Sequence, residues 1–225
     1  MLLVLFWIIG SLTLTSAAVI IGKKHGVSFL IAIYSALVVM ANIFANKIVL
    51  FGPTTVPAGV IVYGISFLIT DAINEFYGVK EAQKSVIAGF ASSIILVFGV
   101  YVTIAWTPAP FWEGQEALAT VLGSTWRIVL ASLISFLVSQ NWDVYFYHQI
   151  RLYTKGKHLW LRNTLSTLTS QLMDTILFCS IAFIGLMPLE NVIGVMIGQL
   201  VVKWIISILD TPFIYLMRYY YEKSN

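Results

Sequence analysis

Long apolar stretches dominate the chain and alternate with short polar segments. Because an α-helix needs about 20 mostly apolar residues to cross a bilayer, each stretch predicts one membrane-spanning helix. The predicted helices cover Leu2 to Ile21, Val27 to Leu50, Val56 to Ile73, Ser85 to Trp106, Thr125 to Tyr147, Thr164 to Met187 and Val192 to Met217. The pattern therefore predicts an all-α fold, a polytopic membrane helix bundle of about seven transmembrane helices.

Composition supports a chain that is solvated by lipid. Hydrophobic residues make up 59% and charged residues 10% of the 225 residues, against about 25% charge in soluble domains. The mean hydropathy is +0.89. After seven crossings this length leaves no room for a separate soluble domain, so residues 1–225 are expected to form a single integral membrane domain.

The first apolar stretch has two interpretations. It could be a cleaved signal peptide, but no basic region precedes it, and it is longer than the usual apolar core of such peptides. We therefore expect residues 1–24 to form a retained extra N-terminal helix, followed by a six-helix core over residues 27–217.

Basic residues occur in every second connection of the predicted bundle. Lys and Arg concentrate on the cytoplasmic side of membrane proteins. This rule predicts a multi-pass protein of the inner (plasma) membrane with its N-terminus outside and its C-terminus in the cytoplasm. The residues that carry the argument are Lys23, Lys24, Lys80, Lys84, Arg151, Lys155, Lys157, Arg162, Arg218 and Lys223.

The longest connection, Thr107 to Ser124, contains Glu113 and Glu116 and no basic residue. Its segment Ala109 to Gly123 has two interpretations, a short helix on the membrane surface or an irregular cap over a pocket.

Several ionisable side chains fall inside predicted membrane helices. Insertion of a charged group costs about 2.5 to 3.5 kcal/mol, so such residues usually face partners, water or a substrate path. The ionisable candidates are Lys47, Asp71, Glu75, Asp143, Asp174, Lys203 and Asp210, and the polar residue Asn42 lies with Lys47 on the second predicted helix.

The most specific pattern is a repeated Ser-Gln-x-x-Asp motif. Its copies begin at Ser139 and Ser170, so Gln140 pairs with Asp143 and Gln171 with Asp174. A spacing of three places each amide and carboxylate on one helix face. Such a pair can bind a planar heterocycle, because a carboxylate accepts hydrogen bonds and an amide both donates and accepts.

Helix association is the alternative role for the repeated motif, since buried polar side chains also join membrane helices. Consecutive helices run in opposite directions, so the two copies are expected at different depths. The repeat alone does not predict a symmetric clamp.

The third predicted helix contains Pro57, Gly59 and Gly64, and a short segment interrupted by Gly and Pro indicates a broken helix near a site. Asp71 and Glu75 lie four residues apart at its inner end and would face the same way. The alternative is an ordinary helix end whose acids are solvated or paired with Lys80 and Lys84.

A second group of polar residues is assigned to transport, gating or structural pairing. Arg162 is expected to anchor the inner face first and to act as a gate or partner second. Asn163 is a candidate cap of the sixth helix and Ser166 follows it. Lys203 is expected to pair with an acid such as Asp174, and Lys47 to reach the outer surface.

Enzyme signatures are scarce, and we expect no enzyme, no cofactor and no metal site. The chain has no Gly-x-x-x-x-Gly-Lys and no His-Glu-x-x-His motif. An intramembrane aspartyl hydrolase using Asp143 and Asp174 is a minor alternative, since a carboxyl pair that shares a proton can activate water. Neither residue has the Gly-x-Gly-Asp context expected of such enzymes.

Several blocks together resemble the queuosine precursor transporter family, also described as vitamin uptake transporters. They span about residues 36–217 and leave only the first helix outside. The blocks are Ala41-Asn42-Ile43 through Lys47, Pro57-Ala58-Gly59, Phe67-Leu68-Ile69-Thr70-Asp71 with Glu75 and Gly78, Ser139-Gln140 with Asp143, and Trp160-Leu161-Arg162-Asn163 with Ser166, Ser170-Gln171 and Asp174-Thr175.

The resemblance implies uptake of 7-cyano-7-deazaguanine (preQ0) and 7-aminomethyl-7-deazaguanine (preQ1) for salvage into tRNA queuosine. It implies a small-molecule ligand, a lipid environment and no nucleic-acid partner. For a guanine-like ring, Asp174 and Gln171 are expected at the hydrogen-bonding edge, with Asn42, Asp71 and Glu75 as further candidates.

The energy source stays open between two alternatives. The resemblance extends to the substrate-binding components of energy-coupling factor transporters, in which small residues spaced by four pack against an energising partner. Ala41 and Ala45 have this spacing. The chain is therefore either a solitary transporter, for which the buried acids offer a route to proton coupling, or a substrate-binding subunit that needs partner subunits.

Overall fold

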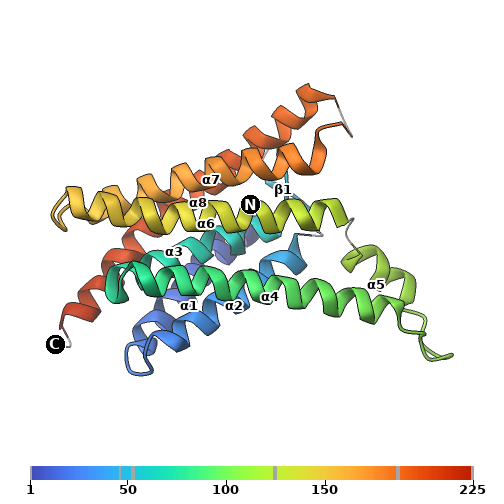
Figure 1. The fold of residues 1–225 in the computed structure, drawn as a ribbon, viewed down its shortest axis with the longest axis horizontal. Coiled ribbons are helices and arrows are strands. Elements are labelled where there is room, and N and C mark those ends of the chain that lie inside the picture. The colour runs from blue at the N-terminus through green and yellow to red at the C-terminus, as the bar shows by residue number, and fades with distance from the viewer. Residues whose placement is uncertain (1, 46, 52–53, 124–125, 186–187, 224–225) are drawn as a thin grey trace.

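A computed structural model of the chain shows a bundle of long helices (Figure 1). It describes residues 2–45, 47–51, 54–123, 126–185 and 188–223. The elements in this part of the chain are α1 (Leu2–Gly22), α2 (Val27–Phe44), β1 (Ile48–Phe51), β2 (Thr54–Pro57), α3 (Gly59–Tyr77), α4 (Val79–Ala105), α5 (Gln115–Leu122), α6 (Trp126–Tyr153), α7 (Leu159–Phe183) and α8 (Leu189–Lys223). The predicted all-helical bundle is confirmed, with one helix for each predicted span.

A β-hairpin separates α2 from α3, and the sequence analysis did not predict it. Strands β1 and β2 pair antiparallel, with Ile48 opposite Pro57. The second predicted helix therefore ends too late, at Leu50, and the third begins too early, at Val56. Apolar run length cannot distinguish a short strand from a helix end, and the β-branched residues of this segment favour the strand.

Five helices are long and apolar enough to cross a membrane, namely α2, α3, α4, α7 and α8. The described apolar part of α1, Phe6–Gly22, is shorter. Helix α6 has 28 residues, but Gln140, Asn141 and Asp143 make its C-terminal half less apolar. By length and composition, the chain is a multi-pass membrane protein.

Helix α3 occupies the centre of the bundle. It contacts α1, α2, α4, α6 and α8, and 83% of its candidate span is buried. Helices α6 and α7 lie side by side and antiparallel, with α8 beside them (Figure 1). Polar residues on α3, α6, α7 and α8 therefore face each other across the bundle rather than lipid.

Helix α3 is continuous, so the predicted broken helix is wrong. The non-helical backbone lies before the helix, in the hairpin whose second strand ends at Pro57. Gly59 begins the helix where it crosses the end of α2. A Cβ atom on Gly59 would overlap the carbonyl oxygen of Ala41 and lie 2.8 Å from the backbone nitrogen of Ala45. The small residues of α2 thus allow close packing against α3 within the same chain.

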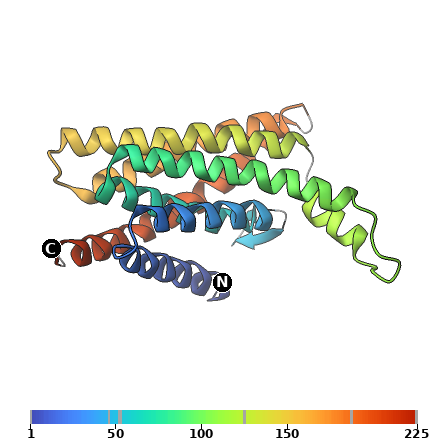
Figure 2. The same ribbon diagram turned by 60° about the horizontal axis from the view of Figure 1, so that its bottom comes forward.

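Helix α1 packs along the outside of the bundle, against α8, α3 and α2 (Figure 2). Its C-terminal end is joined to the C-terminal end of α8 by hydrogen bonds. The Lys23 ammonium donates a hydrogen bond to the Tyr221 carbonyl oxygen at 2.6 Å, and the Tyr221 hydroxyl donates to the Val19 carbonyl at 3.2 Å. These contacts make α1 part of the packed bundle, whereas its retention in the mature protein stays a prediction.

The long loop between α4 and α6 contains the short helix α5, which lies against the end of α4 (Figure 1). The Gln115 side-chain amide donates to the Ile104 carbonyl oxygen at 2.7 Å. The two helices line a pocket whose side chains are mostly apolar, including Leu96, Val100 and Leu118. Of the two interpretations of this loop, the short helix is confirmed, and its position at the membrane surface stays a prediction.

Candidate functional site

The repeated motif forms a reciprocal contact between α6 and α7. The Ser139 hydroxyl donates to Asp174 Oδ1 at 3.3 Å, and the Ser170 hydroxyl donates to Asp143 Oδ1 at 3.1 Å. Each serine therefore binds the aspartate of the other copy. The expectation that the two copies lie at different depths is wrong.

The turn between the two helices explains this alignment. It is short, and Gly156 adopts a left-handed conformation with φ of 77°. In an antiparallel helical hairpin, residues equally distant from the turn lie at the same depth. Ser139 and Asp174 satisfy this relation, and so do Asp143 and Ser170. The spacing of the copies around the turn was the sequence signal that could have predicted the contact.

The Asp174 cluster, formed by Tyr63, Ser139, Asp174, Thr175 and Lys203, lies on one side of this contact. The Lys203 ammonium lies 2.7 Å from Asp174 Oδ2 and donates to the Thr175 hydroxyl at 3.0 Å. The Tyr63 hydroxyl donates to Asp174 Oδ1 at 2.9 Å. The predicted pairing of Lys203 with Asp174 is confirmed. Every polar atom of this carboxylate has a partner, and the pair is electrically neutral.

The carboxyl cluster, formed by Asp71, Asp143 and Asp210, lies between α3, α6 and α8. The Thr167 hydroxyl donates to Asp71 Oδ2 at 3.4 Å, and the Asn163 amide donates to Asp210 Oδ1 at 2.9 Å. All three carboxyl groups are buried. In the part of the chain that the structure describes, none of the three has an ion pair with Lys, Arg or His.

Asn163 does not cap the sixth predicted helix, contrary to the sequence prediction. Helix α7 begins at Leu159, one turn earlier, and His158 precedes it. Asn163 is therefore an internal, fully buried residue whose amide faces Asp210. Ser166 is buried one turn later and donates back to the Asn163 carbonyl oxygen at 3.3 Å.

Gln140 and Gln171 are the polar residues with the least satisfied side chains. Both are fully buried, and the nitrogen and oxygen of both amides have no hydrogen-bond partner. A buried polar atom without a partner costs about 1 to 3 kcal/mol. These amides lie next to the reciprocal serine and aspartate contacts, so the repeated motif contains four unused donor and acceptor atoms.

The Glu75 cluster, formed by Glu75, Tyr147, Arg151, Arg162 and Arg218, lies at the C-terminal end of α3. The Arg162 guanidinium makes two hydrogen bonds to Glu75, at 2.5 and 3.1 Å, and the Tyr147 hydroxyl donates to Glu75 Oε2 at 3.2 Å. Arg151 and Arg218 lie 3.9 and 3.6 Å from the same carboxylate. Three arginines from α6, α7 and α8 therefore surround one acid of α3.

Two sequence expectations are corrected by this cluster. Glu75 does not pair with Lys80 or Lys84, because the ends of α6, α7 and α8 lie closer, and Lys84 instead binds Glu81 at 2.6 Å. Arg162 is fully buried. It is therefore a partner of Glu75 rather than an anchor at the membrane surface.

Asn42 and Lys47 lie apart from these clusters. The Asn42 amide donates to the Ser93 hydroxyl at 3.1 Å and accepts from the Ser132 hydroxyl at 3.4 Å, so it joins α2, α4 and α6. Lys47 is exposed after the end of α2, as expected for a residue that reaches the surface.

Sequence reasoning left several contributors out of the candidate site. Tyr63 binds Asp174, and Tyr147 and Arg151 bind Glu75 and its helix end. Asp210 was noted inside a predicted helix but was given no role, and it accepts a hydrogen bond from Asn163. Tyr63 lies about two turns before Asp71 on α3, so its helical spacing was the available signal. Nothing in the sequence linked Tyr147 to a residue 72 positions away.

The arrangement disfavours the aspartyl hydrolase alternative. That reaction needs Asp143 and Asp174 to share a proton. Asp174 is instead neutralised by Lys203, and each aspartate binds the serine of the other motif copy.

Comparisons with known proteins place the chain among transporters. The sequence model of a family described as "Putative vitamin uptake transporter" matches residues 57–217. A protein of Bacillus subtilis (strain 168) named "Probable queuosine precursor transporter" is 35% identical over 212 residues, which cover 93% of this chain and 92% of that protein. The "Queuosine precursor transporter" of Escherichia coli (strain K12) is 29% identical over 117 residues, 52% of this chain and 50% of the relative. No solved structure matches the chain significantly.

Proposed function

We propose that this chain, which belongs to the vitamin uptake transporter family and has relatives named queuosine precursor transporters, imports 7-deazaguanine precursors of queuosine. The ligands are 7-cyano-7-deazaguanine and 7-aminomethyl-7-deazaguanine. The protein acts as a transporter rather than an enzyme, and the transported solute leaves the site chemically unchanged.

The observation that carries this proposal is the pair of buried amides in the repeated motif. A guanine-like ring presents a carbonyl acceptor beside ring N–H and amino donors. An amide offers both a donor and an acceptor, and a carboxylate offers acceptors. In the part of the chain that the structure describes, the four amide atoms of Gln140 and Gln171 have no hydrogen-bond partner and can bind such an edge.

Asp174 has a different role in this proposal from the one expected from sequence. Its oxygens already accept from Tyr63, Ser139 and Lys203. It therefore acts as a positioning residue that holds α3, α6 and α8 around the two amides. We still expect Asp174→Asn to abolish uptake, because the replacement leaves the Lys203 ammonium buried without its counter-ion.

The packing of α2 supports a self-sufficient transporter over a partner-dependent subunit. Ala41 and Ala45 have the spacing of a partner-binding surface, but they lie against Gly59 of α3. Ala41 is buried in this contact. Ala41 is therefore engaged within the chain, whereas Ala45, just after α2, keeps an exposed surface.

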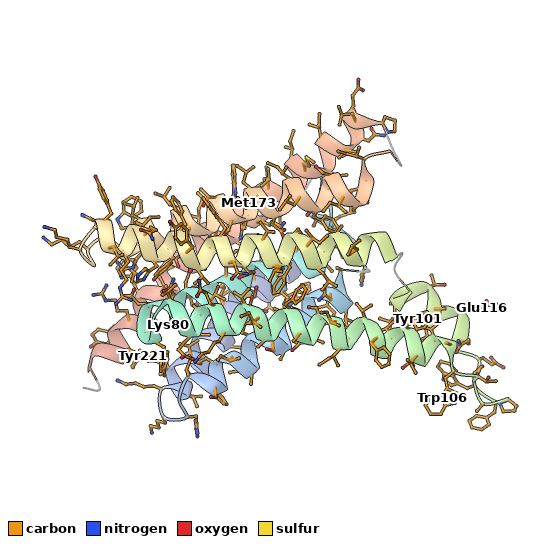
Figure 3. All side chains as sticks on the ribbon, viewed as in Figure 1. Lys80, Tyr101, Trp106, Glu116, Met173 and Tyr221 are labelled. Atoms are coloured by element: carbon orange, nitrogen blue, oxygen red, sulfur yellow. The ribbon has the colours of Figure 1, made fainter. Side chains whose placement is uncertain are left out.

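We place the Glu75 cluster at the cytoplasmic face. Figure 3 shows Lys80 and Tyr221 near one end of the bundle and Trp106 and Glu116 near the other. Basic connections favour the cytoplasm. In a Cys179→Ser background, a membrane-impermeant maleimide applied to intact cells should label Glu116→Cys and leave Lys155→Cys unlabelled. The reverse labelling would overturn the orientation.

Uptake of radiolabelled 7-cyano-7-deazaguanine into proteoliposomes that contain only this protein tests the function. We expect accumulation by the unmodified protein and at least a tenfold loss for Gln140→Leu and Gln171→Leu, since each change removes about two hydrogen bonds to the ring. Gln199→Leu is the matched control. Gln199 is also buried, but its amide faces Cys179 instead of the repeated motif.

Two results would contradict the proposal. Normal uptake by both Gln140→Leu and Gln171→Leu would remove the amides from the site. Binding of the ligand without uptake by the purified protein would favour the partner-dependent subunit, and absence of both would remove the ligand assignment.

A further inference from the structure

In the part of the chain that the structure describes, four buried oxygen atoms in and beside the carboxyl cluster lack a hydrogen-bond donor. They are Asp71 Oδ1, Asp143 Oδ2, Asp210 Oδ2 and Asn163 Oδ1. Ionised carboxyl groups and amide oxygens only accept hydrogen bonds. The four atoms therefore cannot satisfy each other while the three acids are charged.

The carboxyl cluster also lacks compensating charge. Asp174 is paired with Lys203, and Glu75 is surrounded by arginines. Within the described ranges, Asp71, Asp143 and Asp210 have no such cation, although at most 1% of each is exposed. Three adjacent buried anions without counter-ions are strongly unfavourable, and such groups take up protons instead.

One missing donor is placed between Asp71 and Asp143. Their carboxyl groups accept hydrogen bonds from hydroxyls that lie one turn apart on α7, so the two groups are neighbours. Thr167 donates to the other oxygen of Asp71, and Ser170 donates to the other oxygen of Asp143. Two carboxyl groups form a hydrogen bond only when one proton lies between them, so one shared proton would supply the donor that the two remaining oxygens lack.

A second missing donor is placed between Asp210 and Asn163. The Asn163 amide nitrogen donates to Asp210 Oδ1 at 2.9 Å, whereas the remaining oxygen of each group has no partner. A protonated carboxyl and a primary amide can form two hydrogen bonds in opposite directions. A proton on Asp210 Oδ2 supplies the second bond and satisfies the last two free oxygens.

We propose that this conformation holds two protons, one shared by Asp71 and Asp143 and one on Asp210 facing Asn163, and that their release and rebinding drive solute uptake. The coupling to solute rests on the proposed function above. Asp143 connects the shared proton with the solute site, because Gln140 of that site lies three residues away on the same face of α6.

Among the described residues, the titratable groups around the carboxyl cluster supply no positive charge that could neutralise it in place of the protons. On α7, Arg162 is bound to Glu75 of α3, and on α8, Lys203 is bound to Asp174. Tyr34 of α2 faces Asp143, and Tyr147 of α6 lies near Asp71 and binds Glu75. On α4, Glu81 is paired with Lys84, and residues 6–22 of α1 contain no titratable side chain.

Infrared spectroscopy of the reconstituted protein tests the protons directly and needs no substrate. We expect the carbonyl stretching band of protonated carboxyl groups at neutral pH. Asp210→Asn should weaken this band, and so should Asp143→Asn, because these side chains carry the protons. Glu81→Gln is the control, since Glu81 is paired and partly exposed, and should leave the band unchanged. A spectrum without protonated carboxyl groups at neutral pH would overturn the proposal.

Transport assays test the coupling. Asp210→Asn imitates the protonated acid, so it preserves the contact with Asn163 and should fold. We expect this variant to lose accumulation driven by an imposed proton gradient but to keep exchange of labelled for unlabelled 7-cyano-7-deazaguanine. Gradient-driven accumulation equal to that of the unmodified protein would overturn the coupling. Failure of the unmodified protein to exchange the ligand would contradict the proposed function, and the infrared band would still decide whether the protons are present.

Discussion

The Lys203 and Asp174 pair makes a quantitative prediction about the stability of the bundle. The relevant changes are Lys203→Met, Asp174→Asn and both together. Met keeps most of the apolar stem of Lys, and Asn still accepts hydrogen bonds from Tyr63 and Ser139. The two single variants therefore remove one charge each with little change in shape.

The structure sets the size of the effect. The ammonium and carboxylate atoms are 2.7 Å apart, and the two side chains are only 3% and 9% exposed. At an effective dielectric constant of about 20, their attraction is about 6 kcal/mol. Desolvation offsets much of this energy when both charges are present, but removal of one partner leaves the other charge buried and costs about 3 to 5 kcal/mol.

The double variant should be less destabilised than the sum of the single variants. It removes both charges and leaves no buried ion without a partner. We expect a coupling energy of at least about 2 kcal/mol, within the range measured for close charged pairs. Unfolding in mixed micelles of increasing dodecyl sulfate content, followed by tryptophan fluorescence, provides the four free energies of the cycle.

The exposed pair of Glu81 and Lys84 is the control for this cycle. Its side chains are 26% and 65% exposed, so Glu81→Gln and Lys84→Met should couple by less than about 1 kcal/mol. Additive effects of Lys203→Met and Asp174→Asn, within about 0.5 kcal/mol, would refute the reasoning that the buried pair holds α7 to α8.

Two further predictions concern packing and the Glu75 cluster. Gly59→Ala should lower the free energy of unfolding by about 1 to 3 kcal/mol in the same assay, because the added methyl group meets the backbone carbonyl of Ala41. Gly99→Ala, where nothing lies within 4 Å of the new atom, should be neutral or stabilising by up to about 1 kcal/mol. Glu75→Gln should cost about 3 to 5 kcal/mol, since it leaves the buried Arg162 guanidinium without its carboxylate; an unchanged unfolding curve would show that the arginines do not depend on Glu75.

The seven long helices could be located from the sequence, whereas some of their ends could not. Hydrophobic length predicts a span reliably, because lipid requires every backbone polar group to be bonded within the helix. The hairpin between α2 and α3 escaped this rule, since Ile48 to Phe51 is as apolar as the helix before it. Only the pairing of β1 with β2 distinguishes the two conformations.

The candidate site could be predicted in its residues but only partly in its contacts. Gln140, Asp143, Gln171 and Asp174 were selected by a repeated motif and by the cost of polar groups in lipid. The pairing of Asp174 with Lys203 also followed from charge alone. The partners of Glu75 did not, because they come from three helices that are distant along the chain.

The sequence by itself determined that this protein spans the membrane many times and that polar groups line its interior, because both follow from the solvation of single residues and from their spacing along one helix. Only the tertiary structure decided which acids have a counter-ion and which do not. Asp174 and Asp143 occupy the same position in two copies of one motif, yet Lys203 of α8 neutralises the first, and another acid, Asp71 of α3, faces the second. Charge balance in a buried core depends on the groups that packing brings within a few ångströms, and local sequence does not specify those neighbours.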